Sequence, residues 1–461
     1  MTLKHTTRSL TRRLRPSPER FAAAAALQDP NLLLQLRAAQ SNGKRPAPAP
    51  KPRPRQRRSR EAGAALLLVA AVALALAWSN SPWHATYESF WGARVGATIG
   101  PWTLGADLRT WIDEGLMTLF FLVVGLEAKR ERDLGSLREG RRLTVPVLAG
   151  LAGILASATV YLAVTAGATG VGAGGWGVAI STDTALALGA LAIAAGPRGD
   201  GLRVFMLTLL VVDDVVALLV ISFVYPGRID PAAVAIAVAL FALLMTMRTV
   251  AGRQFRARGT SHALFTPLSV LTGIALWLAL FESGIDPVVS GLLIGLLTNA
   301  YEPKPEGPAP ISPNDRIRHR LHPLTSLVVV PVFALANAGL HVDHHLLASA
   351  VTSPITWGIV LAYLVGKPIG IVIASWAASK GTSGRAVLSL SRLELRGTAL
   401  SAGIGFTASL LIASRAFNGA LLDQAKVGIL ATALLTPALT VLALASLRRP
   451  RRVLTTSPCT A

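Results

Sequence analysis

The most constraining feature of this 461-residue sequence is a long apolar segment with two adjacent aspartates at its centre. The segment runs from Leu202 to Tyr225, long enough to cross a bilayer as one helix, which needs about 20 residues. In a helix that crosses the bilayer, these aspartates would lie near the bilayer centre, where an aspartate costs roughly 2.5–3.5 kcal/mol on insertion scales. Valines flank Asp213 and Asp214 on both sides, where a loop between two short helices would favour glycine or proline. We therefore expect these two carboxylates to be the functional centre.

Composition and segment pattern place the chain among helical membrane proteins. Hydrophobic residues make up 52% of the chain and charged residues only 15%, as in polytopic membrane proteins. Lysine and arginine concentrate in the loops after even-numbered apolar segments, so the positive-inside bias predicts twelve crossings with both termini in the cytoplasm. We expect an all-α fold with about 12 transmembrane helices. The predicted segments span about residues 63–79, 111–128, 144–166, 176–196, 202–225, 231–250, 263–281, 286–300, 324–340, 355–378, 397–417 and 424–447.

The two ends of the chain are polar and basic. Residues 1–60 hold 15 lysines and arginines against two acids, and the proline-rich run 46–55 cannot build a core, so a disordered cytoplasmic tail is expected. Most of the net charge of +21 belongs to this tail, which favours a topology signal and a contact with anionic membrane lipid over nucleic-acid binding. Residues 61–448 form the predicted transmembrane domain, and 449–461 a second cytoplasmic tail. The single cysteine, Cys459, excludes a disulfide framework.

Two apolar segments carry residues that are typical of interrupted helices. In the fourth segment, Thr182 and Asp183 have side chains that cap the free amides of a first helical turn, so the helix is expected to break there, with Asp183 balancing a positive helix end. In the eleventh segment, Gly403, Gly405 and Thr407 offer the flexible backbone that a second interruption needs. Glycines also serve close helix packing, and that alternative stays open.

Lys367 lies in the middle of the tenth segment, where Pro368 bends the helix. An ammonium group in lipid needs a carboxylate partner, and Asp213 or Asp214 is the obvious candidate. Because adjacent helical residues point about 100° apart, we expect one aspartate to face Lys367 and the other to face a water-filled site.

Several motifs occur in a characteristic order along the chain: Trp111–Met117, Phe120–Arg130, Thr182–Gly189, Asp213–Asp214, Ser283–Ile285, Pro331–Gly339, Gly366–Gly370 and Gly403–Thr407. Through these motifs the sequence resembles the NhaA family of bacterial sodium/proton antiporters, over about residues 63–447. The resemblance implies that segments three to five and ten to twelve are inverted repeats, with the fourth and eleventh unwound where they cross.

The resemblance also implies residue roles. Asp213 and Asp214, with Thr182, are the implied ion-binding residues, and Asp183 and Lys367 are implied in proton coupling and in compensating the facing helix ends. The spacing of Glu127 and Arg130, three residues apart at a helix end, alone indicates a surface ion pair. The family instead places Glu127 in a cytoplasmic funnel. The residues expected to line that funnel or respond to pH are Glu114, Glu127, Arg130, His319 and His322.

Three positions depart from the family pattern. Asp286 follows Ser-Gly-Ile where the family usually has a histidine, and Arg318 replaces a glutamate linked to pH response. Glu114 would be an aspartate in the best-known members. The core pattern is matched while the pH-sensing periphery is altered, so the family's pH profile is not expected to carry over.

These residues predict a secondary active transporter, not an enzyme, and no cofactor is expected. Sodium prefers oxygen ligands, and a carboxylate that takes up a proton loses the charge that holds the metal. Alternating access then turns competition between Na⁺ (or Li⁺) and H⁺ into exchange. The resemblance implies electrogenic exchange for sodium extrusion and pH homeostasis in the bacterial inner membrane, and admits a homodimer.

Three other classes of protein share some of these features. A sodium-coupled symporter of an organic anion shares the architecture and would be separated by its substrate. An intramembrane aspartyl protease also uses two membrane acids, but its Gly-x-Gly-Asp element is missing and Lys367 would be an odd neighbour for an acid dyad. A non-transporting scaffold would have no need of buried charges.

Overall fold

Helices make up nearly all of the computed structural model, and a two-stranded hairpin is the sheet found among the residues it describes. In that part of the chain, seven helices are long and apolar enough to cross a membrane, or eight if one bent pair is a single span. The prediction of an all-α polytopic membrane protein is therefore confirmed. Residues 1–53 and the C-terminal tail with Cys459 lie outside the described ranges. Those ranges are 54–99, 102–134, 140–167, 172–194, 199–258, 265–301, 312–381 and 392–445.

The first helix and the stretch after it differ from the prediction. Helix α3 (Pro54–Ser79) begins inside the predicted tail. The polar and aromatic stretch that follows contains helix α4 (His84–Trp91) and an antiparallel hairpin of strands β1 (Arg94–Ile99) and β2 (Trp102–Asp107). Alternating small, β-branched and apolar residues allow these short strands to pair, a pattern too brief to stand out in the sequence. A short helix, α5 (Leu108–Thr110), leads into the bundle.

Small residues let two helices of the second and eighth predicted segments touch through their backbones. The π-helical turn η1 (Trp111–Leu116) continues into α6 (Met117–Leu134), which packs along α12 (Val288–Leu297). A Cβ atom on Gly295 would lie 2.6 Å from the carbonyl oxygen of Leu122. Such close backbone approach is the usual role of glycine at helix interfaces in membranes.

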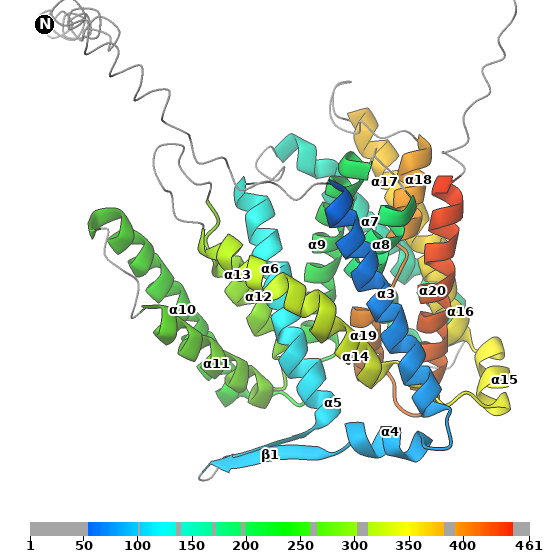
Figure 1. Ribbon diagram of the computed structural model, residues 1–461, viewed down its shortest axis with the longest axis horizontal. Helices are drawn as coiled ribbons and strands as arrows, with labels where there is room; N and C mark the ends of the chain where they lie inside the picture. The colour runs from blue at the N-terminus through cyan, green and yellow to red at the C-terminus, as the bar shows by residue number, and fades with distance from the viewer. Residues whose placement is uncertain are drawn as a thin grey trace, which may run out of the picture. The chain divides into compact units, whose positions relative to one another are not determined.

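Two further groups of helices complete this side of the bundle. Helices α10 (Pro231–Arg258) and α11 (Phe265–Ser283) pack against each other (Figure 1). The ninth predicted segment is preceded by a helix that its apolar pattern did not reveal. This helix, α13 (Pro313–Leu324), is polar, and the side chain of Ser312 caps its first turn. It runs through the π-helical turn η5 (Thr325–Val329) into α14 (Val330–Asn337).

The remaining helices form the part of the bundle that holds the candidate site. Helix α7 packs along α16, η6 and α17, and α20 packs on α8, α16 and α18. A Cβ atom on Gly370 would overlap the carbonyl oxygen of Ala152, so α17 meets α7 at backbone distance. Their bounds are α7 (Gly140–Thr165), α9 (Gly199–Val224), α15 (His344–Thr352), α16 (Pro354–Leu361), the π-helical turn η6 (Ala362–Gly366), α17 (Lys367–Gly381) and α20 (Ala420–Ala445).

Two helices of this part are interrupted. The 3₁₀ helix η3 (Ala173–Ala179) and α8 (Thr184–Ala194) are bent by 46° at the break between them. Helix α18 (Arg392–Ser401) is likewise separated from α19 (Thr407–Ala416) by non-helical residues. The twelve crossings, the inverted repeats and the unwound crossing of a membrane stay predictions.

Alanine substitutions at two glycines test the packing of α6 on α12 through their effects on stability. Gly295→Ala should lower the free energy of unfolding by roughly 1–3 kcal/mol, because the new Cβ forces two backbones apart. Gly63→Ala, in α3 with nothing within 4 Å of its Cβ, should leave stability unchanged or raise it slightly. Thermal unfolding in detergent measures both, and equal effects would contradict the close contact.

Candidate functional site

The two helix interruptions meet at Asp183, a fully buried residue. Its backbone amide donates a 2.6 Å hydrogen bond to the carbonyl of Ile404 in the second break. Its carboxylate accepts from the amide of Leu186 at 2.9 Å and from the amide of Thr407 at 3.4 Å. These amides belong to the first turns of α8 and α19. One carboxylate therefore caps two helices whose N-terminal ends both carry partial positive charge.

Lys367 forms a fully buried ion pair. Its Nζ lies 2.8 Å from Oδ2 of Asp213, and both side chains are 0% exposed. The same nitrogen donates to the carbonyl of Ile180 at 2.5 Å and to Oγ1 of Thr182 at 2.6 Å. Three acceptors match the three protons of an ammonium group. The sequence left either aspartate open as the partner of Lys367, and the structure pairs it with Asp213.

Thr182 connects this ion pair to both breaks. Its Oγ1 lies 2.6 Å from Oδ2 of Asp213 and 2.7 Å from the carbonyl oxygen of Ala402. A hydroxyl has one proton to donate, so these two oxygens share it while Lys367 donates to the hydroxyl. A change in the position or protonation of any of these groups therefore alters the hydrogen bonds of the others.

Asp214 lies beside this network and is 3% exposed. Within the described residues, neither a hydrogen bond nor an ion pair reaches its carboxylate, and Oδ1 of Asp213 also has no hydrogen-bond partner. Buried carboxylate oxygens without partners are costly unless they hold a proton or a cation. The arrangement can therefore accept either one.

The glycines of the second break pack closely against Tyr363. A Cβ atom on Gly405 would overlap the ring of Tyr363, and one on Gly403 would overlap the backbone carbonyl of the same residue. Sequence reasoning missed Tyr363. It lies one helical turn before Lys367, so a polar hydroxyl on the same face of an apolar segment was the available signal.

The residues grouped as a funnel do not all lie together. Arg130 Nε pairs with Oδ1 of Asp315 at 3.0 Å, and Nη2 of Arg318 lies 3.4 Å from that oxygen. Half-buried Glu127 lies on α6 one turn before Arg130. His319 and His322 are exposed on α13.

Glu114 lies apart from Glu127, and its role in the funnel or in a pH response stays a prediction. Thirteen residues of nearly continuous helix separate the two, or about 20 Å at 1.5 Å per residue. Glu114 Oε1 instead pairs with Nη2 of Arg415 at 2.6 Å, and Oδ2 of Asp286 lies 3.5 Å from the same nitrogen. Next to this group, Asn337 donates a 2.6 Å hydrogen bond to buried Asp113, an acid that sequence reasoning also missed.

The buried ion pair predicts strong coupling between its members. Lys367→Met or Asp213→Asn alone leaves one buried charge unpaired and should cost roughly 3–5 kcal/mol, whereas the double variant should cost much less than the sum. Thermal unfolding of the three variants in detergent gives the coupling energy. Glu61→Gln, which removes a partly exposed pair with Arg203, serves as the control and should cost at most about 1 kcal/mol. Additive losses at Lys367 and Asp213 would contradict the pairing.

Comparison with known proteins identifies the family. A family model described as "Na+/H+ antiporter 1" matches residues 55–444. "Na(+)/H(+) antiporter NhaA 1" of Salinispora arenicola is 46% identical over 383 residues, which cover 77% of this chain and 56% of that protein. "Na(+)/H(+) antiporter NhaA 3" of Frankia alni is 36% identical over 386 residues, 77% of this chain and 80% of that protein. The chain thus spans little more than half the length of its Salinispora relative. The resemblance inferred from the motifs is confirmed, and the chain belongs to the Na⁺/H⁺ antiporter 1 family.

Proposed function

We propose that this protein exchanges Na⁺ or Li⁺ for H⁺ across the bacterial cytoplasmic membrane. The observation that carries the proposal is the buried pair Asp213 and Asp214. Within the described residues, Oδ1 of Asp213 and the carboxylate of Asp214 have no protein donor, whereas Oδ2 of Asp213 pairs with Lys367. Hard alkali cations prefer such oxygens. The relatives reported above are all named as Na⁺/H⁺ antiporters, which supports the same substrates.

Sodium and protons compete for these oxygens. In the sodium-loaded form, the carboxylate of Asp214 and Oδ1 of Asp213 hold the cation, and the hydroxyl of Thr182 turns its proton to the carbonyl of Ala402. In the proton-loaded form, Asp214 carries a proton and Asp213 returns to its full interaction with Lys367. While Lys367 keeps its proton, the charges of the two aspartates, the lysine and any bound sodium sum to zero in both forms, which a low-dielectric interior favours.

The ion pair supplies the second proton. When Na⁺ binds Asp213, the carboxylate attracts the Lys367 ammonium less strongly, so the lysine releases a proton together with Asp214. Two protons then leave for each sodium ion, which makes exchange electrogenic. Asp183 caps the positive ends of α8 and α19, and these helix ends favour its ionised form.

The remaining predictions belong to this proposal. Glu127, Arg130, His319 and His322, on α6 and α13, contribute to the cytoplasmic approach to the site, and both termini lie in the cytoplasm. A homodimer and a lipid contact of residues 1–60 are further expectations. The anion symporter and the protease gain no support from the comparisons, since the matching family is described as an antiporter family.

The proposal predicts that Asp214→Asn abolishes exchange. The amide keeps the size of the side chain but cannot lose a proton to make room for a cation, so exchange should fall at least about 100-fold, or about 2.7 kcal/mol. Proteoliposomes with an internal pH dye, challenged with NaCl and LiCl, give the measurement.

Asp423→Asn, on α20 and outside the cluster, is the matched control and should retain exchange. Sodium-driven proton movement that persists in Asp214→Asn would refute the assignment. Proton movement in the unmodified protein that requires an organic anion would favour the symporter.

A further inference from the structure

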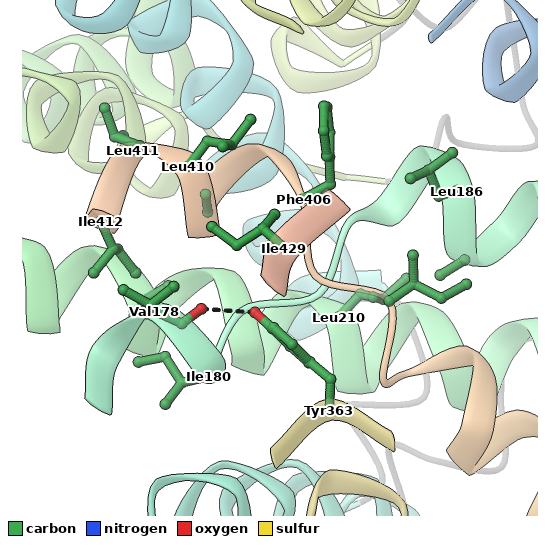
Figure 2. Close-up of a cluster of buried hydrophobic side chains, with 14 of the residues drawn as sticks. Val178, Ile180, Leu186, Leu210, Tyr363, Phe406, Leu410, Leu411, Ile412 and Ile429 are labelled. Atoms are coloured by element: carbon green, nitrogen blue, oxygen red, sulfur yellow. Dashed lines mark hydrogen bonds between the residues drawn. The ribbon is translucent and has the colours of Figure 1, made fainter. Parts of the chain in front are cut away.

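Tyr363 is fully buried in η6 and its hydroxyl joins the two interrupted helices. The hydroxyl donates a 2.8 Å hydrogen bond to the carbonyl of Val178, near the end of η3, as the dashed line in Figure 2 shows. The same oxygen lies 2.5 Å from Oγ of Ser409, in the first turn of α19. One side chain of the tenth segment therefore holds the last turn before one break and the first turn after the other.

The ring of Tyr363 also sets the path of the second break. It occupies the space beside Gly405, where a Cβ atom would overlap the ring. Figure 2 draws Tyr363 as one of the side chains of a buried hydrophobic cluster, with its hydroxyl directed at Val178. The backbone between α18 and α19 is thus packed directly on the ring.

Tyr363 contacts Lys367 as well. The Nζ atom lies 5.9 Å from the centre of the ring, within the range of a cation–π interaction of about 6 Å. The other acceptors of Lys367, the carbonyl of Ile180 and the hydroxyl of Thr182, lie two and four residues beyond Val178. A shift of the η3 end would therefore move them relative to the ammonium group.

We propose that Tyr363 is a positioning residue for exchange: it holds both helix breaks in register beside Lys367 and so sets the arrangement of the groups that form the cation site. The inference rests on the proposed function. Packing alone would be served by phenylalanine, since a buried hydroxyl is favourable only when it is hydrogen-bonded. This hydroxyl has partners on two separate interrupted helices.

The chain offers a matched control in Tyr161. It is equally buried, on α7, and its hydroxyl donates a 2.8 Å hydrogen bond to the carbonyl of Gly172, just before the opposite end of η3. Among the described residues, no hydrogen bond or cation–π contact joins Tyr161 to Ser409 or Lys367. Tyr161→Phe and Tyr363→Phe thus remove the same kind of hydrogen bond at the two ends of one short helix.

The experiment measures Na⁺-dependent exchange of both variants in proteoliposomes from acidic to alkaline pH, with thermal unfolding in parallel. Both variants should lose a similar amount of thermal stability. Tyr363→Phe should raise KM for Na⁺ by up to about tenfold, the size of one hydrogen bond, with kcat little changed, because the two helix breaks that carry the site lose a shared anchor. Tyr161→Phe should keep the KM of the unmodified protein.

Three results would contradict the inference, and they distinguish its failure from that of the proposed function. A normal KM in Tyr363→Phe, while the unmodified protein exchanges, overturns the positioning role alone. Equal shifts in both tyrosine variants overturn it too, because they indicate a general loss of packing. An unmodified protein that moves no protons with Na⁺ overturns the proposed function and this inference together.

A second measurement does not depend on transport. Gly405→Ala should unfold at a much lower temperature, and Tyr363→Leu in the same chain should restore part of the loss by making room for the methyl group. Gly403→Ala should not be restored by the same change, because its methyl group meets the Tyr363 backbone. Failure to restore Gly405→Ala would overturn the view that the ring sets the second break.

Discussion

An ammonium group and a carboxylate, both removed from solvent, lie at the centre of this bundle. Lys367 and Asp213 are 2.8 Å apart and completely buried. Such a pair is tolerable only when the remaining protons of the ammonium group find acceptors. Those acceptors are available because the fourth segment stops being helical: the carbonyl of Ile180 no longer serves a helix and is free to accept from Lys367.

The interruptions have their own requirements, and the surrounding residues meet them. Helices that end inside a protein leave unpaired amides and carbonyls. Asp183 takes amides of α8 and α19, Thr182 reaches the carbonyl of Ala402, and Tyr363 takes the carbonyl of Val178. Within the described residues, Oδ1 of Asp213 has no hydrogen-bond partner, and neither a hydrogen bond nor an ion pair reaches the Asp214 carboxylate. These are the oxygens that the proposed exchange uses for a cation or a proton.

Sequence alone predicted the parts of this site that are costly in a membrane. Two central aspartates, a central lysine and a cap-forming Ser-Thr-Asp-Thr run have no inexpensive structural explanation in an apolar segment, so they stand out. Tyr363 did not, because tyrosine is an ordinary core residue until its hydroxyl is traced. The choice of Asp213 over Asp214 depends on helix rotation, and the pairing of Glu114 with Arg415 on contacts between segments far apart in sequence. The hairpin was not predicted because its alternating pattern is too brief to stand out, and the start of α13 was not predicted because it is polar.

The central claim is that one buried carboxylate site holds a cation and protons by turns. The most direct test adds NaCl to the purified protein in weakly buffered detergent solution and measures proton release together with Na⁺ affinity across pH. The account predicts that sodium binding releases between one and two protons and that affinity rises with pH. Sodium binding that releases no proton and has the same affinity at every pH would contradict it.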